Sequence, residues 1–147
     1  TVITDPKKRF QMKMGFIDFS ELNEYTNEII EKFNVKTTGV SALASSLSGG
    51  NLQKFVVGRE IGQKPSLFIV NQPTWGVDAL SAANIRQAIV DIANTGAAII
   101  LISQDLDEIL EISNKVAFLT NGNLSIPTNT MDIKTVDIGA IMGGISD

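Results

Sequence analysis

Two short apolar runs constrain most strongly how this chain can fold. The first, SLFIV, covers residues 66–70, and the second, AAIILIS, covers residues 97–103. Each has the length of a strand, and an unbroken apolar run is typical of a strand that is covered on both faces. Between them, residues 81–94 have a helical pattern that ends at Thr95-Gly96. A strand, a helix and a second strand in this order predict a parallel pair joined by a right-handed crossover.

The alternation of strands and helices continues toward the C-terminus. The sequence DLDEILEI predicts a short helix, KVAFLT predicts a third strand, and NLSI predicts a fourth strand after an Asn121-Gly122 turn. Another short helix is expected near residues 133–142. The predicted fold class is therefore α/β, with a mostly parallel sheet flanked by helices.

The N-terminal part of the chain has helical patterns and no apolar run of the strand type. After a stretch that reads as loop, a helical pattern begins at Ser20, which fits an N-cap, and a second helix is expected over residues 51–62. The apolar positions of the first helix recur at three- and four-residue steps: Leu22, Tyr25, Ile29, Ile30 and Phe33. We therefore predict a helical subdomain with an N-terminal loop over residues 1–63, and an α/β half over residues 64–147.

Composition excludes several kinds of function. The net charge is −4 and the sequence pI is about 4.8, which argues against a protein dedicated to nucleic-acid binding. The 147 residues include no cysteine and no histidine, so the commonest metal ligand and the commonest general base are both missing. No apolar run approaches the ~20 residues of a membrane helix, so a cytoplasmic setting is expected.

The sequence LSGGNLQK, residues 47–54, places a serine and two glycines at the start of the second helix. The hydroxyl, the unobstructed backbone N–H groups and the helix dipole would together attract a phosphate there. Taken alone, the motif also fits the simpler interpretation that Ser48 caps a helix.

The motifs that follow make the interpretation specific. The first strand ends in FIVNQPT and runs into WGVD at residues 75–78, and the second ends in ISQDLDE at residues 102–108. In this order the four motifs resemble the second half of an ATP-binding cassette (ABC) transporter ATPase. LSGGNLQK matches the family's signature motif, FIVNQPT its Walker B strand, WGVD its D-loop and ISQDLDE its switch segment. The resemblance covers about residues 19–124 and implies a P-loop NTPase-like cassette.

Within that family the chain is most similar to the second cassette of importer subunits that carry two cassettes in tandem. The PT-x-G-x-D turn and the S-x-x-LDEI segment without histidine resemble that second cassette. The glutamine before PT resembles the nucleoside branch, and a ribose-type monosaccharide importer is the alternative.

Three amides stand where the family has catalytic groups. By resemblance, Asn71 occupies the position of the Walker B aspartate, Gln72 that of the catalytic glutamate, and Gln104 that of the switch histidine. An amide carries no charge and accepts no proton at neutral pH, and loss of a positioned base typically costs about 10²–10⁴ in rate. No competent catalytic residue and no competent metal ligand is therefore expected, although each amide alone would also suit an ordinary turn.

The phosphate-binding pattern GxxxxGK[ST] is missing from these 147 residues. In the family this loop lies upstream of the helical subdomain, so either the chain is a C-terminal part of a cassette, which we expect, or the parent protein lacks the loop. The parent protein is expected to be an ATPase, and the chain alone to be inactive and to bind no nucleotide.

The resemblance gives the intact motifs a role in trans. Ser48, Gly49, Gly50 and Asn51 would contact the γ-phosphate of ATP, held with Mg²⁺ by a partner cassette, and Asp78 of the D-loop would couple the two sites. The implied partners are that cassette, membrane-spanning permease subunits and, indirectly, a solute-binding protein, with no nucleic acid. The implied location is the cytoplasmic side of the membrane, where the permease would hold the chain peripherally.

Three alternatives stay open. In the first, this half is active because Gln72 still orients a water, as a glutamine does in some GTPases. In the second, the chain is a regulatory or scaffolding module that has kept the fold without handling nucleotide. In the third, an α/β domain resembles a cassette by chance, and four ordered motifs argue against this.

Overall fold

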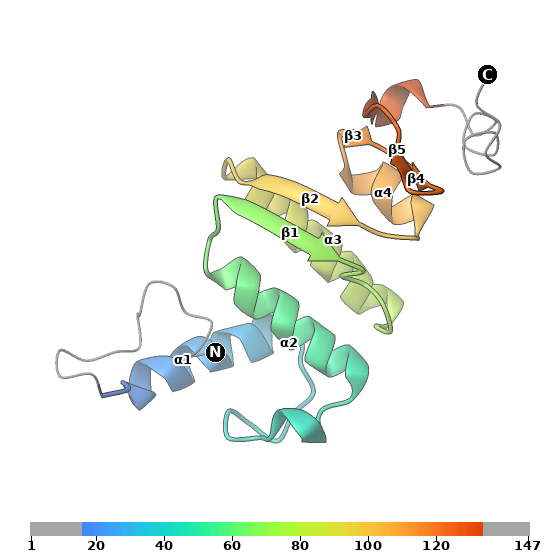
Figure 1. Ribbon diagram of the computed structural model, residues 1–147. Coiled ribbons are helices and arrows are strands. Elements are labelled where there is room, and N and C mark those ends of the chain that lie inside the picture. Colours follow the sequence, from blue (N-terminus) through green and yellow to red (C-terminus); the bar gives the residue numbers. More distant parts are fainter. Residues whose placement is uncertain (1–15, 134–147) are drawn as a thin grey trace. The chain divides into compact units, whose positions relative to one another are not determined.

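The computed structural model describes residues 16–133, which form two compact units (Figure 1). One unit ends at Ile102 and the other begins at Ser103. The first contains α1 (Phe19–Lys32), a 3₁₀ turn (Ala44–Ser46), α2 (Gly49–Gly62), β1 (Leu67–Asn71), α3 (Ala79–Asn94) and β2 (Ala98–Ile102). Among the described helices, none is long and apolar enough to cross a membrane. The boundary between residues 63 and 64 stays a prediction, and the predicted N-terminal loop lies mostly outside the described residues.

The predicted strand–helix–strand unit is confirmed. Strands β1 and β2 pair in parallel over their full lengths, from Leu67 opposite Ala98 to Asn71 opposite Ile102. Helix α3 connects them, and its buried positions, including Ile85 and Ile89, recur at helical spacing. The pairing brings the carboxyl ends of both strands to the same edge.

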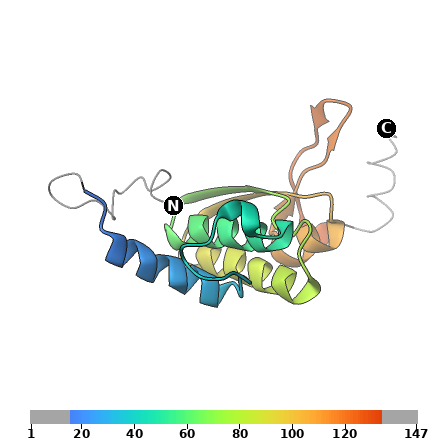
Figure 2. The same ribbon diagram turned by 90° about the horizontal axis from the view of Figure 1, so that it is seen from below.

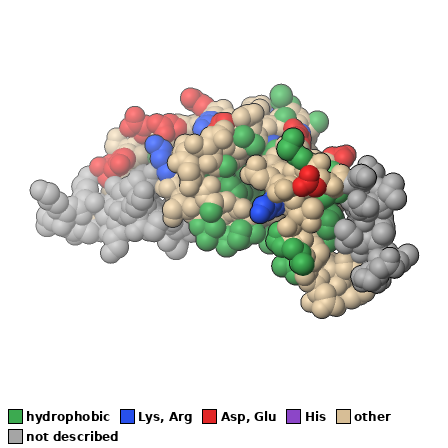
Figure 3. All heavy atoms as spheres, turned by 90° about the horizontal axis from the view of Figure 1, so that it is seen from above, with side chains coloured by type: hydrophobic (Ala, Val, Ile, Leu, Met, Phe, Trp, Pro, Cys, Tyr) green, Lys and Arg blue, Asp and Glu red, His purple; other side chains and the backbone are tan. Residues whose placement is uncertain are grey.

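The prediction that these strands are covered on both faces is wrong for this chain. Phe68 and Val70 are buried, but the alternating residues Leu67 and Ile69 are 51% and 60% exposed. Figure 2 shows the reason: α2 and α3 lie on the same side of the strand pair, and no described element of the first unit covers the opposite face. An apolar run indicates that both faces of a strand can be buried. It does not show that the chain contains elements to cover both faces. Hydrophobic side chains accordingly reach the surface in Figure 3.

Helices α1 and α2 run antiparallel and pack closely. The hydroxyl of Tyr25 donates to the carbonyl oxygen of Arg59 at 2.8 Å, and the ring of Phe33 lies against Gly58. The N-cap of α1 is Asp18, not the predicted Ser20. The carboxylate of Asp18 accepts from the backbone N–H groups of Ser20 and Glu21, which places Ser20 inside the first turn.

The second unit contains no long strand among its described residues. It consists of α4 (Leu106–Ile112), β3 (Lys115–Val116), β4 (Leu119–Thr120), β5 (Asn123–Leu124), β6 (Thr128–Asn129) and a 3₁₀ turn (Thr130–Asp132). The predicted third strand is therefore two short ones: β3 pairs antiparallel with β6, and β4 pairs antiparallel with β5.

The Asn121-Gly122 turn explains the departure from a mostly parallel sheet. Both residues have positive φ, 51° and 79°, which is the requirement of a tight hairpin turn, so β4 folds back onto β5. The turn itself was predicted from the sequence and is confirmed. The helix expected near residues 133–142 lies, apart from its first residue, outside the described residues.

Candidate functional site

The N-terminus of α2 presents the LSGG motif. Ser48 is the N-cap, and its hydroxyl oxygen accepts from the backbone N–H of Asn51 at 3.4 Å. The first bond of the helix runs from the N–H of Leu52 to the carbonyl oxygen of Ser48. Within the described part of the chain, the N–H groups of Gly49 and Gly50 have no acceptor. Two free donors at the positive end of a helix favour an anion.

Asn51 is used to hold this loop in place. Its side-chain N–H group donates to the Ser48 hydroxyl at 2.9 Å, and its side-chain oxygen accepts from the backbone N–H of Lys36, also at 2.9 Å. Both ends of the amide therefore have protein partners. The side chain ties the helix start to the segment that follows α1.

The two amides lie together at the end of β1. Asn71 is the last residue of the strand and is exposed, and the backbone N–H of Gln72 donates to the carbonyl oxygen of Ile102 at 2.8 Å. Gln72 has φ of 50°, a left-handed conformation that few residues other than glycine adopt readily. Neutral amide oxygens at these two positions do not make a charged donor set for Mg²⁺. The described residues also hold no group of three or more potential metal-ligating side chains.

Residues 72–78 connect β1 to α3 and are called here the 72–78 turn. Asp78 is the last residue of this turn. The Asp78 carboxylate accepts from the backbone N–H of Ser81 at 2.9 Å and from its hydroxyl at 2.6 Å. The bond from this hydroxyl is the largest cause that lowers the pKa of Asp78 below its ordinary value. The carboxylate is therefore engaged as the N-cap of its own helix.

Gln104 lies in the second unit, in the loop before α4, and its side chain is exposed. The helix that follows is capped by Asp105, whose carboxylate accepts from the backbone N–H of Glu108 at 3.1 Å. Glu108 is 1% exposed, and within the described residues neither of its side-chain oxygens has a hydrogen-bond partner. The helical pattern gave no sign that this glutamate is buried.

The side chains of Gln53 and Lys54 make contacts that the sequence did not predict. The Gln53 amide donates to the carbonyl oxygens of Gln72 and Pro73. Lys54 is 5% exposed and donates to the carbonyl oxygen of Asn34 at 2.7 Å. These side chains belong to the LSGGNLQK segment, but their partners are 19 to 20 residues away, so only the folded chain reveals them.

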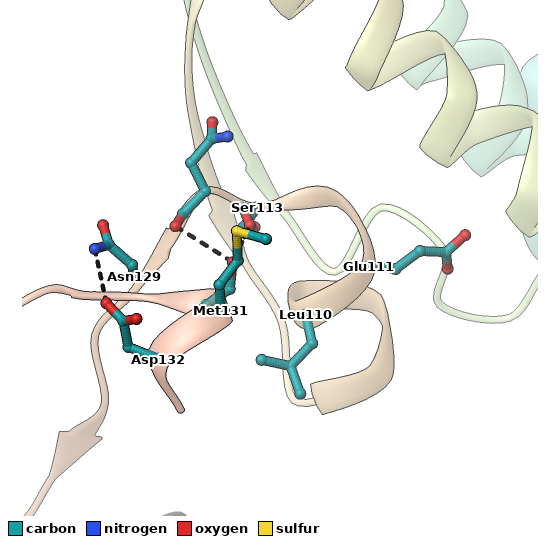
Figure 4. Close-up of a pocket in the computed structure, with 8 residues that line it drawn as sticks. Leu110, Glu111, Ser113, Asn129, Met131 and Asp132 are labelled. Atoms are coloured by element: carbon teal, nitrogen blue, oxygen red, sulfur yellow. Dashed lines mark hydrogen bonds between the residues drawn. The ribbon is translucent and has the colours of Figure 1, made fainter. Parts of the chain in front are cut away.

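Two hollows lie away from these positions. One, of about 540 Å³, lies among α1, α2 and α3 and includes Ile29, Phe33 and Ile92. The other, of about 510 Å³, lies in the second unit between the end of α4 and the turn at Met131 (Figure 4). Met131 is 97% exposed, so this second hollow is open to solvent. Neither hollow is lined by a residue that the sequence analysis assigned to a site.

Comparisons with known proteins show which proteins this chain resembles. The chain is 36% identical over 132 residues to the nucleoside import ATP-binding protein NupA of Lactococcus lactis, a match that covers 90% of this chain and 26% of that protein. It is 38% identical over 133 residues to the glucose import ATP-binding protein TsgD13 of Haloferax volcanii, with 89% and 24% covered. It is 33% identical over 135 residues to the galactose/methyl galactoside import ATP-binding protein MglA of Escherichia coli, with 92% and 26% covered. No protein-family model matches.

Solved structures agree on the fold. The dimeric ATP-binding cassette MJ0796 bound to ADP and Pi superposes with a TM-score of 0.69 at 18% identity, covering 79% of this chain and 50% of that one. An ATP-binding subunit of an ABC transporter gives 0.66 at 19% identity, with 86% and 50% covered.

The homologues of this chain are thus ATP-binding proteins of ABC importers for nucleosides and sugars, and its fold is that of part of an ABC ATPase cassette, as the motifs predict. The chain spans about a quarter of the length of these curated relatives and about half of the solved cassettes.

Proposed function

We propose that this chain lends its signature motif to an ATP site whose other residues belong to a partner cassette. The observation that carries the proposal is the start of α2, where the N–H groups of Gly49 and Gly50 have no acceptor among residues 16–133 and lie beside the Ser48 hydroxyl. A γ-phosphate oxygen would satisfy these donors, and the helix dipole would add about 0.3–1 kcal/mol. Asn51 supports the contact by fixing Ser48.

The other side of the site is degenerate in this proposal. Asn71 and Gln72 offer neither a negative charge for Mg²⁺ nor a base for the attacking water, and the sequence contains no phosphate-binding loop. The chain would therefore be the C-terminal part of a second, non-hydrolysing cassette. ATP and Mg²⁺ bound by the partner would supply the phosphate and its charge. This chain would bind the γ-phosphate and orient it.

The relatives support a transport role for the protein that carries this chain. NupA, TsgD13 and MglA are import proteins by name, which supports an importer here, with permease subunits and a solute-binding protein as further partners. We favour a nucleoside because of Gln72, with a monosaccharide as the alternative. The chain would act on the cytoplasmic side of the membrane, where the permease would hold it.

The test uses a protein that carries this chain together with an intact partner cassette. Ser48→Arg is expected to abolish ATP turnover, because it places a bulky side chain where the phosphate would lie. Gln72→Ala is expected to change turnover little, because that position performs no chemistry in this proposal. Steady-state ATPase assays measure both.

Two controls separate the phosphate contact from stability. Ser45→Arg makes the same change at an exposed serine three residues earlier and should leave turnover unchanged. Ser48→Ala removes the cap, which typically costs about 1 kcal/mol of stability, together with the hydroxyl beside the phosphate, but it keeps the Gly49 and Gly50 N–H groups accessible. Full turnover in Ser48→Arg would favour a scaffolding module, and turnover lost in Gln72→Ala would favour an active half. Micromolar binding of Mg·ATP to this chain alone, measured by calorimetry, would contradict the proposed division of labour.

A further inference from the structure

The 72–78 turn has little internal support. Gln72 and Gly76 both have positive φ, 50° and 71°. Its internal backbone bonds are from the N–H of Trp75 to the carbonyl oxygen of Gln72 at 3.2 Å and from Val77 to Thr74 at 3.4 Å. Trp75 is 73% exposed, so its side chain adds little packing. A turn of this kind keeps one shape only if a neighbouring element braces it.

Gln53 of α2 provides such a brace. Its side-chain N–H group donates to the carbonyl oxygen of Gln72 at 3.1 Å and to that of Pro73 at 3.1 Å. Pro73 is among the most completely buried side chains, so its position is fixed by packing as well. These two hydrogen bonds hold the first two residues of the turn in place, and the first of them, Gln72, has the left-handed conformation.

A second contact joins the same two elements at the other end of the turn. A Cβ atom added to Gly50 would lie 2.7 Å from the carbonyl oxygen of Gly76. Atoms this close cannot be accommodated without movement, so the backbone of the LSGG motif lies directly against the turn. Gln53 lies three residues further along, close to one helical turn, on the same side of α2 as Gly50.

We infer that Gln53 is a positioning residue that fixes the 72–78 turn to the LSGG end of α2, so that both present one rigid surface to the partner's ATP. The inference rests on the proposed function, and it adds a residue that touches no nucleotide itself. If the brace is lost, the turn and the helix start move independently. The phosphate donors of Gly49 and Gly50 would then be held less accurately.

The first experiment measures the brace in the chain itself. Gln53→Met keeps the length of the side chain and removes both donors. Hydrogen exchange of the Trp75 and Val77 amides is expected to become about three- to tenfold faster, the size of one or two lost net hydrogen bonds. The matched control is Gln87→Met, because Gln87 is exposed and its one partner among the described residues is Asp91 on its own helix. Unchanged exchange in Gln53→Met would overturn the inference.

The second experiment measures the consequence in a protein that also carries the intact partner cassette. Gln53→Met is expected to raise the KM for ATP and lower kcat, together by about three- to tenfold in kcat/KM, while Gln87→Met changes neither. Faster exchange with unchanged kcat and KM would overturn the positioning role. Failure of the proposed function would be seen in a different measurement, as full ATP turnover in Ser48→Arg. That result does not depend on the effect of Gln53→Met on hydrogen exchange in the 72–78 turn.

Discussion

At the scale of single residues, the two glycines of the LSGG motif have different constraints. A Cβ atom at Gly50 would meet the Gly76 carbonyl oxygen at 2.7 Å, whereas nothing lies within 4 Å of the corresponding position at Gly49. Gly50→Ala is therefore expected to destabilise the chain by about 1–3 kcal/mol, the usual cost of forcing an extra group into a packed contact. Gly49→Ala is the matched control and should change stability by less than about 1 kcal/mol. Urea unfolding measures both, and equal effects would contradict the assignment.

Asp78 gives a prediction about pH. Its pKa is lowered from 3.8, chiefly by the hydrogen bond from the Ser81 hydroxyl. Because the folded state has the lower pKa, the ionised carboxylate favours folding above pH 3.8, and this contribution is lost as the pH falls through the folded-state value. Asp78→Asn keeps a capping oxygen that does not ionise. The stability difference between wild type and variant should therefore shrink as the pH falls from about 6 to about 2.5.

The measurement for Asp78 is urea unfolding of both proteins across that range of pH. The slopes of the unfolding curves should stay equal, so that only the midpoints report the change. A stability difference that is the same at low and neutral pH would show that the carboxylate charge contributes nothing to the cap of α3.

At the scale of elements, the start of α1 can be tested directly. The Asp18 carboxylate caps the backbone N–H groups of Ser20 and Glu21. Asp18→Ala is expected to cost about 1 kcal/mol of stability, as removal of an N-cap typically does. Ser20→Ala, at the position that the sequence pattern favoured, should cost less than about 0.5 kcal/mol because Ser20 is exposed in the first turn. Thermal unfolding ranks the two variants, and the reverse order would restore Ser20 as the cap.

The elements also indicate how far sequence reasoning reaches. Period and motif order predict α2, α3 and the parallel pair, because local pattern and fold agree there. Two capping residues lie two positions apart near α1, and the apolar pattern does not choose between Asp18 and Ser20. The predicted strand KVAFLT is interrupted between β3 and β4, where the backbone N–H of Phe118 donates to the Ser125 hydroxyl and its carbonyl oxygen accepts from the backbone N–H of Ser125. The contacts of Gln53 depend on backbone carbonyl groups, which no sequence pattern marks.

At the scale of the whole molecule, the described residues of the first unit cover one side of its strand pair only. Leu67 and Ile69 of β1 share the open face with Ile100 and Ile102 of β2, and these four side chains are 49–60% exposed. The register places Ile69 beside Ile100 and Leu67 beside Ala98, so the exposed apolar side chains are adjacent. A contiguous apolar surface on a short pair of strands favours association with another surface.

The last prediction concerns this open face. In solution the chain is expected to self-associate, because burial of the four side chains removes apolar surface from water at about 25 cal/mol per Å². Ile69→Thr combined with Ile100→Thr should shift sedimentation toward the monomer, since threonine keeps the β-branched shape that suits a strand. Ile126→Thr is the matched control, because Ile126 is 86% exposed and belongs to the second unit. If the control dissociates the chain as well as the double variant does, general surface hydrophobicity drives association, and the open face of β1 and β2 does not.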